Sequence, residues 1–385
     1  MKLSINRDLL LKAINLVVKA ADKRHRFAIL ANIKLVLEEG FLTLTASDLE
    51  LELTTRFALP KDGCIQAGST TLPAEMFFSV CKSLPEEVVV IDAPEDTTHC
   101  IITSGTGRYT LSCLPADDFP TIGTATPLSV IKISQGNLSS LLHHTRSAMA
   151  TQDVRYYLTG MLFDIGENTL TAVATDGHRL SVSYRLLNET YAPNQVIIPG
   201  KAVAELERLL IELAKTVDDS NIVELGFDAE FLQVGLVLKD EDTDNEITVK
   251  LSARLIEGKF PDYRRVIPAN NDKIVLFNKD EAVDVLRRIS VLNTKEEPGV
   301  LMNFDTTDFC KVGVTNRNLG EAEEMLGVNY SGDAIELTFN EAYRCAVLNV
   351  LEGEVCLELN QPSSPALIYQ VGDDLHRYVI MPMRR

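Results

Sequence analysis

The sequence lacks any apolar stretch of about 18 residues, the length at which a helix could cross a membrane. Near its start it carries Arg7 and Asp8, where a signal peptide would need a continuous apolar run. Glycine and proline, at 21 and 15 residues, are too sparse for a disordered or fibrous chain. These absences predict a folded, soluble, cytoplasmic protein.

Paired cysteines and short catalytic motifs are also missing. The seven cysteines are scattered and contain no CxxC pair, which predicts buried free thiols rather than disulfides or a metal site. The sequence has no phosphate-cradling glycine loop and no HExxH, GxSxG or EF-hand pattern. We therefore expect no catalytic residue, no metal and no cofactor.

Positive charge is outweighed by negative charge, because 37 Lys and Arg stand against 55 Asp and Glu and the net charge is −18. Affinity for phosphate normally comes from clustered Lys and Arg, so this value argues against a nucleic-acid binder. In residues 6–26, however, six basic residues outnumber two acidic ones, for a local charge of +4. The run from Lys19 to Arg26 could complement a helix dipole or contact phosphates, and the sequence leaves both open.

An internal threefold repeat organises the 385 residues, a length that by itself predicts two or three domains. A short strand followed by an amphipathic helix recurs at 3–17, 131–142 and 275–286, with Asn6, Ser134 and Asn278 as helix caps. A strand ending in Asp48 recurs 128 residues later at Asp176, the spacing that also separates Ile5 from Ile133, and a third copy ends at Asn316.

A second strand–helix unit recurs at 70–78, 196–203 and 336–343, with Pro73 and Pro199 expected in the first helical turn. The repeat predicts three similar α+β domains at about 1–127, 128–270 and 271–385, joined by turn-rich linkers at 121–127 and 267–272. The acidic stretch at 239–246 is interpreted as a solvated hairpin tip.

Three polar clusters have more than one interpretation. Asp176 and His178 could form an acid–base pair, although the Gly177 between them favours a turn in which Asp176 caps backbone amides. The adjacent His143 and His144 point apart on a helix and are expected on its solvated surface. The segment 155–157, Arg-Tyr-Tyr, has the composition of a nucleic-acid contact but also of an ordinary strand.

Five segments together resemble the bacterial DNA polymerase sliding clamp family, the beta subunit of DNA polymerase III. They are CLPADDFP at 113–120, QDVRYYLTGMLF at 152–163, ATDGHRL at 174–180, GKFPDYRRV at 258–266 and YVIMPMR at 378–384. The resemblance implies a DNA clamp fold in which two subunits close head to tail into a ring, with helices lining the hole and sheets outside. A closed ring holds DNA by topology, which would reconcile DNA binding with an acidic chain.

The same resemblance implies a function and site residues. The chain would be a non-enzymatic processivity factor, a homodimer that encircles double-stranded DNA without sequence specificity and binds the polymerase catalytic subunit, the clamp loader and other clamp-motif proteins. DNA contacts would include Arg24, Gln152, Tyr156 and Tyr157. The dimer interface would include Tyr109 and Leu111 facing Val291 and Leu292. The partner-peptide pocket would comprise Leu158, Thr175, Gly177, His178, Arg179, Leu180, Pro261, Arg265, Val266, Val379, Met381, Pro382 and Met383.

Two functions of other classes compete with this one. A hydrolase or transferase would use Asp176 and His178 in a chemical step. A repeat-built scaffold would bind peptides but no DNA, and the repeat alone permits it.

Overall fold

The computed structural model describes residues 1–95, 97–122, 126–239, 245–294 and 296–383, without the side chains of 343–345. Segment 240–244 of the expected acidic hairpin tip and segment 123–125 of the first expected linker lie outside the described residues. Contacts divide the chain into two compact units. Unit 1 is Met1–Ser139 with Ala204–Leu255, and unit 2 is Ser140–Val203 with Ile256–Arg385.

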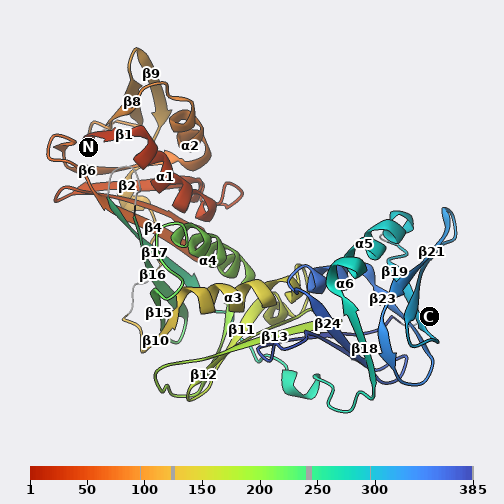
Figure 1. The fold of residues 1–385 in the computed structure, drawn as a ribbon. Coiled ribbons are helices and arrows are strands. Elements are labelled where there is room, and N and C mark those ends of the chain that lie inside the picture. Colours follow the sequence, from red (N-terminus) through yellow and green to blue (C-terminus); the bar gives the residue numbers. More distant parts are fainter. Residues whose placement is uncertain (96, 123–125, 240–244, 295, 384–385) are drawn as a thin grey trace. The chain divides into compact units, whose positions relative to one another are not determined.

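Unit 1 contains two antiparallel sheets, ordered β5-β1-β7-β8-β9 and β10-β15-β16-β17-β4-β3-β2-β6. In Figure 1 β4 and β17 run side by side in the second sheet, where Ala253 faces Leu51. Helices α1 (Arg7–Val17) and α2 (Ala74–Ser83) contact each other, and α1 packs on β3 and β4. The strands are β1 Lys2–Asn6, β2 Asn32–Glu38, β3 Phe41–Ser47, β4 Leu51–Ala58, β5 Cys64–Gln66, β6 Gly68–Pro73, β7 Val88–Asp92, β8 His99–Ser104, β9 Gly107–Ser112, β10 Ser129–Ser134, β15 Ile222–Phe227, β16 Phe231–Lys239 and β17 Glu246–Arg254.

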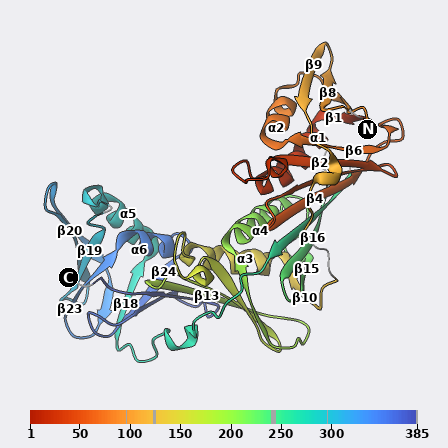
Figure 2. The same cartoon turned by 180° about the vertical axis from the view of Figure 1, so that it is seen from behind.

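Unit 2 contains a nine-stranded sheet, β14-β11-β12-β13-β26-β25-β24-β18-β22, and a four-stranded sheet, β21-β20-β19-β23. Figure 2 shows β13, β24 and β18 of the larger sheet from behind. Helix α5 (Lys279–Ile289) packs on β20, β21 and α6 (Glu341–Leu348). The strands are β11 Gly160–Ile165, β12 Thr169–Thr175, β13 Arg179–Leu186, β14 Asn194–Pro199, β18 Lys273–Asn278, β19 Gly299–Phe304, β20 Phe309–Asn316, β21 Gly320–Gly327, β22 Asn329–Ser331, β23 Ile335–Asn340, β24 Glu354–Leu359, β25 Ala366–Gln370 and β26 His376–Ile380.

Helices α3 (Gln135–Thr145) and α4 (Gly200–Leu213) contribute residues to both units. Short 3₁₀ helices connect several elements, at Val18–Ala20, Ala28–Ala31, Ala116–Asp118, Arg146–Ala148, Tyr156–Leu158, Tyr263–Arg265 and Ser290–Leu292. Among the described residues, no helix is long and apolar enough to cross a membrane.

The strand order repeats three times, as the sequence predicted. One four-stranded arrangement recurs as β1-β7-β8-β9, β10-β15-β16-β17 and β18-β24-β25-β26. A second recurs as β4-β3-β2-β6, β13-β12-β11-β14 and β21-β20-β19-β23. Strands β5 and β22 are additions at the outer edge of the first arrangement. Three α+β copies are therefore present among the described residues, each with two four-stranded arrangements and two α-helices.

Helix starts follow the predicted capping pattern. Asn6 accepts hydrogen bonds from the amides of residues 8 and 9, and Asn278 accepts from those of residues 280 and 281. The Ser134 hydroxyl lies 3.4 Å from the amide of residue 137. The prediction for Pro73 and Pro199 was wrong by about one position, because each is the last residue of a strand immediately before the helix. A proline there keeps the extended conformation of the strand and ends it.

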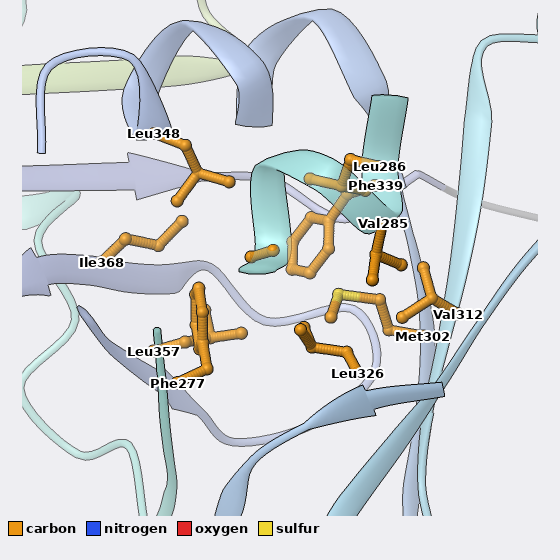
Figure 3. A pocket seen from close by; sticks show the side chains of 11 residues that line it. Phe277, Val285, Leu286, Met302, Val312, Leu326, Phe339, Leu348, Leu357 and Ile368 are labelled. Carbon is orange, nitrogen blue, oxygen red and sulfur yellow. The ribbon is translucent and has the colours of Figure 1, made fainter. Parts of the chain in front are cut away.

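The core of the C-terminal repeat encloses a small apolar void of about 20 Å³ (Figure 3). Side chains from helices and strands converge on it, including Phe277, Leu286, Phe339 and Leu357. An all-apolar space of this size offers a water no hydrogen-bond partner, so it is a packing defect rather than a ligand site. The thiols of the described cysteines are free, and all but the half-buried Cys64 are buried, as expected.

Candidate partner-binding and DNA-contact sites

Asp176 organises the tight turn between β12 and β13. Its Oδ1 accepts hydrogen bonds from the amides of His178 (2.9 Å) and Arg179 (3.0 Å), and its Oδ2 accepts from Arg179 Nε at 3.0 Å. Gly177 adopts φ +89°, a conformation that favours glycine. The Thr175 hydroxyl donates to the carbonyl of Arg179 at 2.6 Å. The carboxylate is thus occupied in holding the turn, and the acid–base interpretation has no support.

The last strand of the chain lies beside this turn. In the β13–β26 ladder Leu180 faces Val379, and the amide of Met381 donates to the carbonyl of His178 at 2.9 Å. Strand pairing thereby brings together two of the predicted pocket segments that are about 200 residues apart in the sequence.

A hydrophobic cluster lies under the predicted pocket. Leu158, Leu180 and Val379 are between 1% and 3% exposed, and they pack with Phe260 and Tyr263. Thr175 is also buried. These predicted pocket residues therefore form a floor rather than an open lining.

The segment before and after the 3₁₀ turn Tyr263–Arg265 forms a rim beside this floor. Pro261 is exposed, Val266 is 39% exposed, and the side chain of Arg265 forms an exposed ion pair with Asp262 at 2.9 Å. Apolar groups with a few polar neighbours are the composition of a groove for short peptides.

A cavity of about 610 Å³ lies beside the end of the chain. Three of the residues predicted for the pocket, Met381, Pro382 and Met383, line this cavity, and the amide of Met383 donates to the carbonyl of Thr338 at 2.7 Å. The sequence analysis missed its other lining residues, which are Glu336, Leu337, Thr338, Pro362 and Ser363. The repeat pattern marked 336–338 only as a strand, and nothing in the sequence joined that strand to the last residues of the chain.

The predicted DNA contacts lie in exposed turns. Arg24 is exposed in the turn after α1, where its amide donates to Asp22. In unit 2, Gln152 is exposed, Tyr156 is 56% exposed, and Tyr157 is half-buried with its ring 5.9 Å from that of Tyr156. The strand interpretation of 155–157 was wrong, because Tyr156–Leu158 forms a 3₁₀ turn.

Of the four predicted dimer contacts, two lie on an edge strand and two in the 3₁₀ helix Ser290–Leu292. Tyr109 and Leu111 are on β9, the outermost strand of its sheet. Val291 follows α5 and is 78% exposed, whereas Leu292 packs against the C-terminal core. Strand β21 is likewise outermost in its sheet.

The prediction for His144 was wrong, because this side chain is half-buried rather than solvated. Its ring stacks on that of His376 at 3.6 Å, and its Nδ1 shares a 2.6 Å hydrogen bond with the hydroxyl of Tyr378. Arg185 donates to His376 Nε2 at 3.1 Å. Burial, followed by the neighbouring positive groups, lowers the pKa of His144 to about 3 and that of His376 to about 4. His143 is exposed, as expected.

Within the described parts of the chain, no three His, Cys, Asp or Glu side chains are arranged to hold a metal ion. Three copies of one α+β module, a buried apolar floor and the structural role of the Asp176 carboxylate indicate a repeat-built binding protein.

Comparisons with known proteins identify the family. Models of the DNA polymerase III beta subunit match in order, the N-terminal domain at residues 1–123, the central domain at 132–262 and the C-terminal domain at 264–384. The beta sliding clamps of Pseudomonas putida and Escherichia coli are 36% and 35% identical to this chain over the full length of both proteins.

Solved structures agree with the sequence matches. The DNA polymerase III beta subunit of Pseudomonas aeruginosa covers the whole chain with a TM-score of 0.88 at 34% identity. The Bartonella birtlesii sliding clamp bound to griselimycin covers it with a TM-score of 0.89 at 30% identity. The chain belongs to the DNA polymerase III beta subunit family of sliding clamps. It is a processivity factor of DNA polymerase and not an enzyme.

Proposed function

We propose that two copies of this chain close head to tail into a ring around duplex DNA in the cytoplasm, with helices lining the hole and sheets outside. Its three domains would be about 1–127, 128–270 and 271–385. The observation that carries the proposal is a pair of unmatched sheet edges. Strand β17 pairs with β4, and β26 pairs with β13, so two of the three first-type arrangements (β10-β15-β16-β17 and β18-β24-β25-β26) each join a second-type one. The equivalent strands β9 and β21 are left as outermost strands of their sheets.

Edge strands expose unpaired backbone N–H and C=O groups, which can form hydrogen bonds with a strand of another chain. Pairing β9 of one subunit with β21 of another would repeat the two internal junctions a third time. Because β9 and β21 are different surfaces, the contact is head to tail, and two such contacts close a two-fold ring of six domains.

The internal junctions also predict the register of the third one. In them, Ala253 faces Leu51 and Ile380 faces Arg179. Ala253 and Ile380 each lie three residues before a residue whose amide donates to a strand of the same repeat. These amides are those of Ile256, which donates to Ile197 on β14, and Met383, which donates to Thr338 on β23.

In the N-terminal repeat the corresponding amide is that of Leu114, which donates to the Thr71 hydroxyl, so Leu111 is the equivalent facing residue. On the other edge strand, β21, we compared the residue pairing in the hairpins β3–β4, β12–β13 and β20–β21. This pairing puts Gly320 at the position equivalent to Leu51 and Arg179. Leu111 would therefore face Gly320 across the interface. Two and three positions along the antiparallel ladder, Tyr109 would face Ala322 and Arg108 would face Glu323.

Cysteine crosslinking tests both the ring and its register. Facing residues of an antiparallel ladder are close enough for a disulfide, so Tyr109→Cys with Ala322→Cys should give a covalent dimer on non-reducing gels. The matched control, Tyr109→Cys with Glu323→Cys, shifts one partner to the opposite face of the sheet and should crosslink poorly. Equal crosslinking of both pairs, or a monomer by sedimentation, would refute the register or the ring.

The placement of charge supports DNA contacts within an acidic protein. The local charge of +4 at 6–26 lies on a chain of −18, and Arg24 in this segment is exposed. In unit 2, the exposed Gln152 and Tyr156 and the half-buried Tyr157 would add hydrogen-bonding and stacking contacts. Weak contacts of this kind let a ring slide, since the ring itself prevents loss.

Retention on DNA tests the topological mechanism. The protein, loaded by a clamp loader on nicked circular DNA, should remain bound at salt high enough to screen phosphate contacts and should leave on linearisation. Equal retention or equal loss on circular and linear DNA would contradict encirclement.

We further propose that the floor, the rim and the cavity by the C-terminus form one peptide pocket for the polymerase catalytic subunit, the clamp loader and other clamp-motif proteins. Leu158, Leu180 and Val379 would form its base, Val266 and Arg265 its rim, and the residues from Met381 to Met383 its far end. The buried apolar base, and an exposed rim that contains the apolar Val266 beside the charged Arg265, support this role. Val266→Asp should abolish partner binding because it places a charge at the apolar position of the rim, and unchanged binding would contradict the assignment.

A further inference from the structure

One buried carboxylate connects the core of unit 2 to the rim of the pocket. Asp164 on β11 is 9% exposed, and its Oδ2 accepts hydrogen bonds from the hydroxyl of Tyr263 at 2.8 Å and from the guanidinium of Arg264 at 2.6 Å. Its Oδ1 accepts from Gln195 Nε2 at 3.0 Å. The two oxygens thus have three donors, two of which come from the rim.

These two donors directly precede the rim residues Arg265 and Val266. Within the same 3₁₀ turn the amide of Arg265 donates to the carbonyl of Asp262, and that of Val266 donates to the carbonyl of Tyr263. A shift of Tyr263 is therefore transmitted to Val266 through one backbone hydrogen bond.

The rim residues themselves have weaker attachments. The side chain of Arg265 is 86% exposed and pairs with an exposed Asp262, and exposed pairs of this kind add little stability. Tyr263 is 6% exposed, packs in the floor cluster, and carries the guanidinium of Arg264 at 4.7 Å from its ring centroid. Tyr263 and Arg264 therefore hold this turn against the body of unit 2, and Asp164 binds both.

We propose that Asp164 is a positioning residue for the partner-peptide pocket: by holding Tyr263 and Arg264 it fixes the Pro261–Val266 rim and thereby sets partner affinity. This inference rests on the proposed pocket. Asp164 would not touch the peptide. Its carboxylate would act through the turn, because a rim that moves by even a fraction of an ångström no longer matches the floor.

The variant Asp164→Asn tests this with little change of shape. The asparagine can still accept from Tyr263, but it removes the charge that holds Arg264. A suitable probe is labelled griselimycin, the compound bound in the Bartonella birtlesii clamp structure. We expect Asp164→Asn to weaken griselimycin binding about tenfold, within the range seen for residues that act on a site indirectly. Loading by the clamp loader, which would use the same pocket, should be weaker, but protein that has been loaded should remain on nicked circular DNA as long as the wild type does.

Two controls separate positioning from general loss of stability. Arg254→Gln removes an exposed arginine–carboxylate ion pair, to Glu230 at 3.0 Å in unit 1, and should leave griselimycin affinity unchanged. Val312→Ala destabilises the C-terminal core, where Val312 is 1% exposed, and should lower the melting temperature without a comparable loss of affinity.

A double variant supplies the decisive measurement. If Arg264 acts only through Asp164, adding Arg264→Gln to Asp164→Asn should cost less affinity than Arg264→Gln costs alone. Full additivity, an unchanged affinity in Asp164→Asn, or an equal loss in Val312→Ala would overturn the positioning role. The proposed pocket itself would instead be refuted if the wild-type protein did not bind griselimycin, or if the Val266→Asp variant bound griselimycin as tightly as the wild type.

Discussion

Unit 2 should be sensitive to acid because it buries a pair of neutral histidines. His144 and His376 stack at 3.6 Å, and the guanidinium of Arg185 donates to His376. Arg377 and the exposed His143 also disfavour a positive charge here, and Asp373 is the acidic group that favours it. Protonating the pair would place two charges in contact beside an arginine.

The sign of the pH dependence follows from the lowered pKa values. Both histidines have a reference pKa of 6.5, which falls to about 3 for His144 and to about 4 for His376 in the folded chain. The unfolded chain therefore binds more protons below pH 6.5. The stability that comes from the neutral pair is fully present above this pH and is lost as the pH falls toward 4.

The magnitude is limited by the unfolded state. Each histidine can cost up to about 1.4 kcal/mol per pH unit below its unfolded pKa, or about 2 kcal/mol between pH 6.5 and 5. Because His144 is only half-buried, water screens part of this effect, and we expect about 2–3 kcal/mol for the pair.

Hydrogen exchange of peptides from β13 and β26, followed from pH 7.5 to 5 and corrected for the intrinsic pH dependence of exchange, measures the effect locally. Protection should fall in the wild type and fall less in the double variant His144→Gln, His376→Gln. His99→Gln is the matched control, since His99 is exposed in unit 1. Parallel losses of protection in the wild type and the double variant would refute the reasoning.

Three further predictions concern stability. Leu357→Ala enlarges the void in the C-terminal core and should cost about 3 kcal/mol in urea unfolding, whereas Val237→Ala at a half-exposed strand position should stay within about 0.5 kcal/mol. Gly177→Ala should cost about 1–2 kcal/mol, because φ is +89° and a Cβ would lie 2.9 Å from the guanidinium of Arg155; an unchanged midpoint would contradict that strain. Asn278→Ala should cost about 1 kcal/mol by removing the cap of α5, and Asn278→Asp should restore most of it.

Features that depend on neighbours in the sequence were predictable. Asn6 and Asn278 cap helices through amides two and three residues ahead, and Asp176 holds its turn in the same way. The threefold repeat was predictable for a related reason, since each copy encodes its own strand and helix starts. The sequence therefore determined the α+β class, the repeat and the structural role of the Asp176 turn.

Features that depend on long-range pairing were decided only by the tertiary structure. His144 is half-buried because β26, more than 200 residues later, brings His376 and Tyr378 against it. In the sequence Asp164 is one polar residue of a strand, and nothing indicates its partner. In the structure its carboxylate accepts a hydrogen bond from Tyr263, which is 99 residues away. Helix caps are local hydrogen bonds, but strand partners and buried polar contacts depend on which surfaces meet after folding, and the periodicity of one segment does not specify them.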